Sequence, residues 1–177
     1  MKERFLGKAK VTNNVSSMSK FTELDKKFMQ QAIELSSSNV ENGGGPFGAV
    51  IVKDGEVVAT GVNRVTANND PTAHAEVSAI RMACQKLSTF RLSGCVIYTS
   101  CEPCPMCLSA IYWAGLDKIY FANTKEDART IDFADAFIYE EIEKPYSQRR
   151  VPFVNMMRED AFKVFQAWID KADKIKY

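Results

Sequence analysis

The stretch CVIYTSCEPCPMC, residues 95–107, joins an apolar run to the start of a helix and so decides the fold. Residues 95–100 are short, apolar and rich in β-branched and aromatic side chains, which is typical of a buried strand. Residues 108–114 form a helical run that Gly115 ends. Residues 118–123, KIYFAN, again favour a buried strand. The order strand, helix, strand indicates a layered α/β sheet.

Two β-rich runs lie upstream of this stretch. They are FGAVIVK at residues 47–53 and EVVATGVN at residues 56–63. Between them stands Asp54-Gly55, a dipeptide that favours the type I′ turn of tight hairpins. The two runs therefore predict a β-hairpin.

Helical spacing recurs on both sides of the strands. Thr22 followed by Asp25 predicts a capped amphipathic helix that ends before Gly43. Residues 73–87, AHAEVSAIRMACQKL, have helical periodicity. Two further helical runs are expected near the C-terminus, at residues 133–143 and 160–172.

Size and charge limit the class of protein. A chain of 177 residues with 46% hydrophobic residues is of the usual size for one domain, and no apolar run approaches the roughly 20 residues of a membrane span. Residues 1–20 are polar and basic without periodicity, which predicts a flexible tail before a domain at 21–177, rather than a targeting helix. We expect a soluble, cytoplasmic protein that binds no membrane.

Cysteine usage points to a metal. Three of the five cysteines, Cys101, Cys104 and Cys107, fall within seven residues, and the chain has a single histidine, His74. Such spacing without a signal peptide indicates thiolate ligands rather than a disulfide framework. A catalytic zinc ion takes three protein ligands and keeps one position for water. His74, Cys104 and Cys107 supply that number.

The sequence also supplies a general acid and base. Cys104 and Cys107 are one helical turn apart, so both sulfurs can face one ion, and zinc lowers the pKa of its bound water to about 7. Glu76 lies two residues after His74, near enough to take the proton of that water and pass it to a departing amine. The order H-x-E followed by P-C-x-x-C is the described signature of zinc-dependent nucleobase deaminases.

Other interpretations of the same residues stay open. Cys101 as a fourth ligand would give a closed structural zinc site, but it leaves Glu76 without a role. A redox C-x-x-C is a second alternative, which Pro103, Pro105 and the paired His-Ala-Glu disfavour. The remaining cysteines are expected in the core, at Cys84 and Cys95.

Longer blocks give a more specific resemblance. GGPFGAVIVKDG, NDPTAHAEV, YTSCEPCPMC, AIYWA, FIYEEI and FQAW resemble the cytidine deaminase-like superfamily and, within it, the bacterial-type guanine deaminases, from about residue 21 to residue 177. The resemblance implies a three-layer α/β/α fold with a mixed five-stranded sheet between helices. It also implies one zinc ion per chain and hydrolysis of guanine to xanthine and ammonia, a step of purine catabolism or salvage.

The resemblance assigns substrate contacts by position. Asn63 looks like the residue that hydrogen-bonds the purine, although it also suits a turn that ends a strand. Phe47 looks like an aromatic wall under the base, or else a core residue. The backbone of Ala75 and the neighbourhood of Cys104 are expected at the departing amine. Trp113 resembles a pocket or dimer-interface aromatic, and helical spacing also allows a core position.

The C-terminal segment closes the active site in the family that the sequence resembles, in some members by exchange between two subunits. Asp135 and Tyr177 occupy the positions expected to approach the purine, although Asp135 also suits a helix N-terminus and a last residue is usually frayed. Ala134 stands where a second acid is common. A homodimer is expected, because residues 108–114 carry more apolar surface than one core covers.

Rival substrates share the zinc machinery. A tRNA adenosine deaminase has to bind an anticodon loop and should carry clustered basic residues. Five of the 23 basic and one of the 22 acidic residues lie in the first twenty, so the remainder has 18 and 21 and a net charge of −3. That charge disfavours long nucleic acid as a partner and favours a small purine. Guanosine, cytosine and triazine deamination, and a structural zinc module without enzyme activity, remain alternatives.

Overall fold

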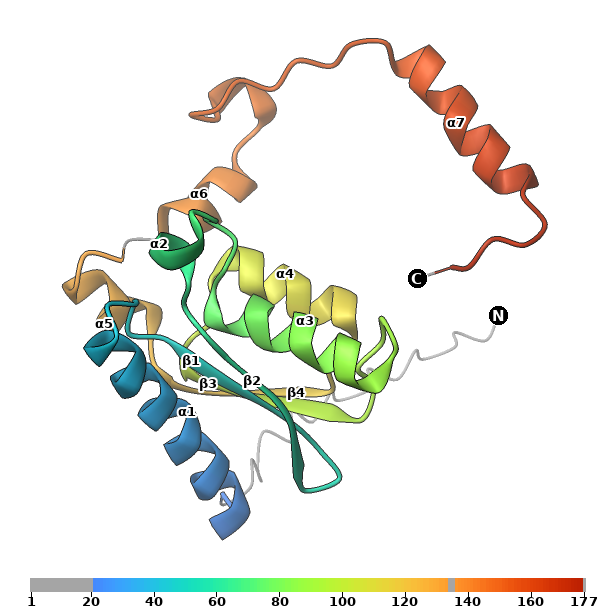
Figure 1. Cartoon of the computed structure of the whole chain (residues 1–177). Coiled ribbons are helices and arrows are strands. Elements are labelled where there is room, and N and C mark those ends of the chain that lie inside the picture. The colour runs from blue at the N-terminus through green and yellow to red at the C-terminus, as the bar shows by residue number, and fades with distance from the viewer. Residues whose placement is uncertain (1–20, 134–135, 177) are drawn as a thin grey trace, which may run out of the picture.

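The computed structural model describes residues 21–133 and 136–176 of the chain (Figure 1). The tail predicted at residues 1–20, and the predicted site residues Asp135 and Tyr177, lie outside the described residues. Ala134 lies outside them as well.

The helices and strands expected from the sequence are present, and three short elements add to them. The unexpected elements are α2, α5 and the 3-10 helix η1. In chain order the elements are α1 (Glu23–Glu41), β1 (Gly48–Lys53), β2 (Glu56–Val62), α2 (Val65–Asn68), α3 (Ala75–Leu87), β3 (Cys95–Cys101), α4 (Pro105–Ala114), β4 (Lys118–Asn123), α5 (Lys125–Thr130), α6 (Ala136–Glu143), η1 (Tyr146–Gln148) and α7 (Arg158–Asp170).

The sheet is mixed, with the strand order β2-β1-β3-β4. β1 runs antiparallel to β2 and to β3, while β3 and β4 are parallel and are joined through α4. The β1–β2 hairpin turns at Asp54 and Gly55, whose φ angles of 51° and 79° are the two positive values of a type I′ turn. The α/β fold class and the hairpin are therefore confirmed.

The number of strands differs from the expected five, because the described residues form four. After β4 the chain enters α5 at once, where Thr124 and Asp127 make a capping box. The later residues form helices and an irregular stretch that contains Pro145 and Pro152. Proline cannot donate to a strand ladder, so this stretch is poorly suited to extend the sheet beyond β4.

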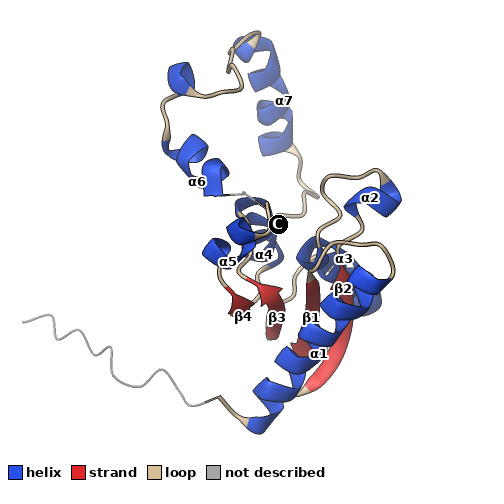
Figure 2. Cartoon of the chain, turned by 90° about the vertical axis from the view of Figure 1, so that its left-hand side faces the viewer, coloured by secondary structure: helices blue, strands red, loops and turns tan. Residues whose placement is uncertain are grey.

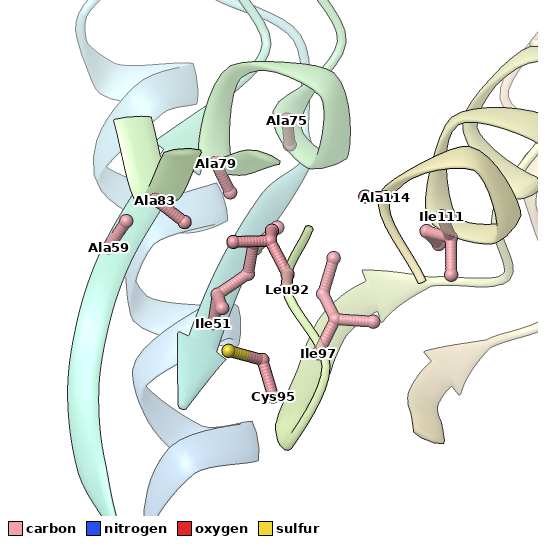
Figure 3. Packing of buried hydrophobic residues seen from close by; sticks show 11 residues of the cluster. Ile51, Ala59, Ala75, Ala79, Ala83, Leu92, Cys95, Ile97, Ile111 and Ala114 are labelled. Carbon is pink, nitrogen blue, oxygen red and sulfur yellow. The ribbon is translucent and has the colours of Figure 1, made fainter. Parts of the chain in front are cut away.

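Alternate residues of β1 face two separate cores. Ala49 and Ile51 point to a cluster with α3 and α4, whereas Val50 and Val52 pack against Phe28 of α1. Figure 3 shows the first cluster, in which side chains of the strands meet the alanines of α3. The sheet therefore lies between α1 on one face and α3 with α4 on the other, as Figure 1 shows.

Glycine residues in the strands allow α1 and α3 to lie directly on the sheet. A Cβ at Gly61 of β2 would lie 2.2 Å from the carbonyl oxygen of Ala75, and one at Gly48 of β1 would lie 2.4 Å from that of Ala32. The backbones of β2 and α3 are thus in contact. This contact fixes the height of the first turn of α3 above the sheet.

We define residues 151–176 as the C-terminal arm, and its helix α7 lies apart from the sheet in both views (Figures 1 and 2). Every residue of α7 is exposed. Among the residues that the structure describes, no helix is long and apolar enough to cross a membrane.

Candidate active site

Two helix N-termini meet at one edge of the sheet and carry the predicted metal ligands. His74 is the N-cap of α3, and Cys104 is the N-cap of α4. Pro105 opens α4, a position where its missing N–H costs nothing, and Cys107 follows within the first turn. The positive ends of two helices therefore point at the same place, which favours thiolate ligands there.

The three ligand atoms have the spacing of a zinc site. His74 Nδ1 lies 3.6 Å from Cys104 Sγ and 3.5 Å from Cys107 Sγ, and all three atoms lie within 4.8 Å of one another. A tetrahedral ion with Zn–S of about 2.3 Å and Zn–N of about 2.0 Å has N···S edges of about 3.5 Å. One nitrogen and two sulfurs at these distances fit zinc.

The sulfur of Cys104 is prepared to be a thiolate. A hydrogen bond from the Cys107 thiol, with a further contribution from His74, lowers the pKa of Cys104 well below its ordinary value. Both cysteines are buried. Ionised sulfur in a buried position calls for a positive partner, and a divalent cation supplies it.

Glu76 lies beside this group, in the first turn of α3. Its side chain is only 6% exposed, and burial raises its pKa above the ordinary value. Its Oε2 atom is 3.4 Å from Cys107 Sγ, and its Oε1 atom accepts a 3.5 Å hydrogen bond from the Thr99 hydroxyl. A carboxyl group held in this way can exchange a proton with a molecule bound next to the sulfurs.

A cavity of about 440 Å³ opens above these residues. Two ligands, His74 and Cys104, line it together with Glu76. The rest of the wall comes from the ends of β1, β2 and β3, from α2 and from the segment after β4, and consists of Gly45, Phe47, Asn63, Val65, Thr66, Pro71, Cys101, Glu102, Ala128, Asp132, Phe133, Phe137 and Ile138.

Two of the predicted substrate residues line this cavity. The ring of Phe47 meets that of Phe133 edge to face, with centroids 4.9 Å apart, and Phe47 also packs against the core. Asn63 is 7% exposed, and its Oδ1 atom accepts a 3.3 Å hydrogen bond from the N–H of Val65. The structure therefore brings an aromatic face and an amide to the same cavity as the candidate metal ligands.

Other predicted site residues lie elsewhere. The side chain of Ala75 is in the core beneath α3, and the contact expected of its backbone, between His74 and Glu76, stays a prediction. Trp113 is 70% exposed on α4 and lines a shallow groove between α3 and α4 instead of the cavity. Within one chain Trp113 is therefore part of neither the core nor the cavity wall, and its role as a dimer-interface aromatic stays a prediction.

The cavity wall also contains residues that the sequence did not single out. Glu102 accepts a 3.0 Å hydrogen bond from the N–H of Lys125 and so connects the end of β3 to the start of α5. Asp132 and Phe133 follow α5. The capping box of Thr124 and Asp127 was a signal for α5, but nothing local in the sequence indicated that this helix leads to the cavity.

Cys101 is not a member of the ligand group. Among the described residues, the group of ligand atoms comprises His74, Cys104 and Cys107 alone, while the Cys101 thiol donates to the carbonyl of Thr124 at 3.6 Å. Three protein ligands rather than four suit a catalytic rather than a structural zinc site. The two cysteines expected in the core, Cys84 and Cys95, pack in the cluster beneath α3.

Comparison with known proteins gives one family. Residues 22–123 match the cytidine and deoxycytidylate deaminase zinc-binding region. The guanine deaminase of Bacillus subtilis is 51% identical over 151 residues, which cover 85% of this chain and 97% of that protein. A tRNA-specific adenosine deaminase of Aquifex aeolicus is 41% identical over 95 residues, 54% of this chain and 63% of that protein.

A solved structure agrees with the sequence comparison. The X-ray structure of the Bacillus subtilis guanine deaminase superposes with a TM-score of 0.84 at 50% identity and covers 86% of this chain and 98% of that one. The matched family region contains both halves of the metal group, one on α3 and one on α4. This chain is therefore an enzyme of the zinc-binding cytidine and deoxycytidylate deaminase family.

Proposed function

We propose that this chain hydrolyses guanine to xanthine and ammonia. The observation that carries the proposal is the extent of the similarity, which covers 97% of the Bacillus subtilis guanine deaminase and runs beyond the zinc-binding region. The similarity to the Aquifex aeolicus tRNA-specific adenosine deaminase covers only 54% of this chain. Residues outside the shared zinc machinery thus favour the free purine.

His74, Cys104 and Cys107 would hold one zinc ion per chain. When bound, zinc acts as a Lewis acid and lowers the pKa of a bound water to about 7, so that a nucleophile is available at neutral pH. The two helix N-termini, at His74 and Cys104, keep the ligand set in place. The cavity wall leaves this side of the group accessible to a small molecule.

Glu76 would carry the protons of the reaction. Its carboxylate would accept one proton from water as the oxygen adds to C2 of guanine and would deliver it to the ring nitrogen. It would then accept the second proton from the added hydroxyl and deliver it to the 2-amino group. The C2–N bond breaks, ammonia leaves and the new oxygen remains as the carbonyl of xanthine. Burial raises the pKa of Glu76, which makes it a better proton acceptor at this point.

Phe47 and Asn63 would bind the base. An aromatic ring offers a face for the flat purine, and an amide offers a donor and an acceptor for its edge. The backbone of Ala75 would contact the amine, and Asp135 and Tyr177 would approach the purine from the C-terminal part. A free base also avoids the cost of extruding a nucleotide from a stack.

A panel of substrates tests this proposal. Ammonia release is measured with zinc-loaded protein on guanine, guanosine, adenine, cytosine and a tRNA anticodon stem-loop. Turnover of guanine is the expected result, with Cys104→Ser losing both zinc and activity and the core variant Cys84→Ser keeping both. Turnover of the stem-loop or of cytosine, but not of guanine, would contradict the proposed substrate and would still agree with zinc-dependent deamination.

We also infer a homodimer in which the C-terminal arm of one copy covers the cavity of the other. The arm presents many exposed apolar side chains, and α7 buries none of its residues on its own chain. Exposed apolar area of this extent is typical of an interface. The outward-facing Tyr112 and Trp113 of α4 are a second surface suited to a partner copy.

The compartment is a further part of the proposal. No disulfide joins the cysteines that the structure describes, and two of them are candidate metal ligands that oxidation would destroy. Such thiols persist where glutathione and thioredoxin keep cysteines reduced. We therefore place the protein in the cytoplasm, which fractionation with a thiol-trapping reagent would test.

A further inference from the structure

One buried polar side chain near the cavity belongs neither to the metal group nor to the substrate wall. Asn39 lies in the last turn of α1, on the same helix face as the core residues Phe28 and Ala32, and is 5% exposed. A polar group in such a place costs stability unless it makes hydrogen bonds. Its partners show what it does.

The amide group of Asn39 connects two loops. Its Nδ2 atom donates to the carbonyl of Gly45 at 2.8 Å and to the carbonyl of Asn63 at 2.9 Å. An amide nitrogen carries two hydrogens, and these two acceptors use both. The first acceptor precedes β1 by three residues and the second directly follows β2, so one side chain ties together the cavity ends of both strands.

The two loop glycines pack on this arrangement. A Cβ at Gly44 would lie 2.3 Å from the Nδ2 atom of Asn39, and a Cβ at Gly45 would lie 3.1 Å from the side-chain Cγ of Asn63. The N–H of Gly44 also donates to the main-chain carbonyl of Asn39 at 2.8 Å. A side chain at residue 44 would therefore collide with the amide of Asn39, whereas one at residue 45 would require a small shift of Asn63.

Phe47 and Asn63 of the cavity wall belong to the two loops that Asn39 connects. The N–H of Asn63 donates to the carbonyl of Phe47 at 3.2 Å, so the aromatic wall and the amide move together. The N–H of Val65 donates to Oδ1 of Asn63, which leaves Nδ2 of Asn63 as the group that can donate to a ring nitrogen or carbonyl of a bound base.

We propose that Asn39 is a positioning residue for purine recognition, which acts by holding Asn63 in a fixed orientation beside Phe47. The proposal rests on the proposed guanine deamination and names a residue that determines its substrate binding. Asn39 itself does not line the cavity. Its effect should therefore appear in binding of the base and pass through Asn63.

The test compares steady-state kinetics of Asn39→Ala with those of the wild type. Losing both hydrogen bonds should raise KM for guanine about tenfold and change kcat less than about threefold, because Glu76 and the metal ligands are unaffected. Asn42→Ala is the matched control: it stands at the same helix end, is exposed and donates to the carbonyl of Ser38 at 2.7 Å. Its KM should equal that of the wild type.

A double variant separates positioning from general weakening of the fold. If Asn39 acts through Asn63, Asn39→Ala should add no further increase of KM, within about twofold, in an Asn63→Ala background. Multiplied effects in the double variant, or an unchanged KM in folded, zinc-loaded Asn39→Ala, would overturn the proposal. Should Asn39→Ala not fold, Asn39→Ser keeps one donor at the position and gives the same readout.

The experiment also distinguishes this inference from the function on which it rests. Wild-type protein without any turnover of guanine would contradict the proposed function. Wild-type turnover with unaltered KM in the Asn39 variants would contradict the positioning role alone.

Discussion

Glu76 is almost completely buried, and its carboxyl group lies within hydrogen-bonding distance of a hydroxyl and a thiol, as a buried polar group requires. Burial favours its protonated form, whereas the neighbouring zinc site when loaded favours the ionised one. A group balanced between the two forms can both accept and deliver a proton. At the scale of the residue, this balance is the basis of the proposed chemistry.

Replacement of Glu76 by Gln keeps the shape of the side chain and removes its ability to take a proton. We expect kcat for guanine to fall by about 10²–10⁴-fold. Zinc content, measured by atomic emission, should stay at one ion per chain, because Glu76 is not a member of the ligand group. Retained turnover of guanine in this variant would contradict the role of Glu76. A wild-type protein that binds zinc but turns over none of the substrates would instead favour a structural zinc module.

At the scale of the element, α1 is attached to the sheet at its N-terminal end by Asp25. The carboxylate of Asp25 accepts from Thr22 in a capping box and from the Tyr98 hydroxyl of β3 at 2.5 Å. These hydrogen bonds, that of the Thr22 side chain first, lower the pKa of Asp25 to about 2. The same residue thus caps a helix and links it to a strand.

The lowered pKa of Asp25 predicts a pH dependence of stability. An aspartate in an unfolded chain has a pKa of about 3.9, so the stabilisation is fully present above pH 4 and is lost as the pH falls from about 4 to about 2. Asp25→Asn should lower the free energy of unfolding by about 1 kcal/mol at pH 7, allowing for solvent screening. In urea titrations the difference from wild type should shrink below pH 4, and a difference independent of pH would refute the assignment.

The close approach of β2 and α3 predicts the effect of added volume. Gly61→Ala places a methyl group against backbone atoms of Ala75 and Ala79, which neither element can move aside cheaply. We expect a loss of about 1–3 kcal/mol in stability. Zinc affinity, measured by competition with a chelator, should fall as well, because α3 begins at His74. The neighbouring Thr60→Val adds no such contact and should change neither quantity appreciably.

Local signals in the sequence were sufficient for most elements. The Asp54-Gly55 turn, the Thr22–Asp25 capping box and Gly115 at the end of α4 each depend on the conformational preference of one or two residues. The metal group was predictable for the same reason, since His74 and Cys104 each stand directly before a helix and Cys107 lies in the first turn of the second one.

What the sequence did not reveal depends on contacts between distant segments. Phe133 reaches Phe47 across the cavity, and Asn39 is linked to Asn63 although 24 residues separate them. In the sequence Asn39 is a polar residue on a helix face, and only the packing of two loops against it shows its contacts. Asn39 is a polar residue that the fold buries, whereas Trp113 is an apolar residue at helical spacing that faces outward.

At the scale of the whole molecule, the C-terminal arm predicts complementation between subunits. A chain ending at residue 150 should bind zinc but turn over guanine poorly, and full-length Glu76→Gln should be inactive. If arms are exchanged, a mixture of the two should regain a measurable part of wild-type activity, because the intact arm closes the cavity that carries Glu76. Dimer mass is checked by light scattering.

The control for complementation places both changes in one chain. A chain that ends at residue 150 and also carries Glu76→Gln offers no arm, so mixing it with the shortened chain should restore nothing. Full activity of the shortened chain alone, or a monomeric wild-type protein, would contradict the proposal that the arm of one copy covers the cavity of the other.

The placement of the metal ligands on two different helices has a thermodynamic consequence for the protein in its cell. The ion would crosslink α3 to α4, and the pocket for it exists only when both are folded, so occupancy and folding are linked equilibria. Each tenfold rise in free zinc above the dissociation constant then adds about 1.4 kcal/mol to the folded state. Cells short of zinc would hold not only fewer active molecules but a less stable population, which proteases remove sooner.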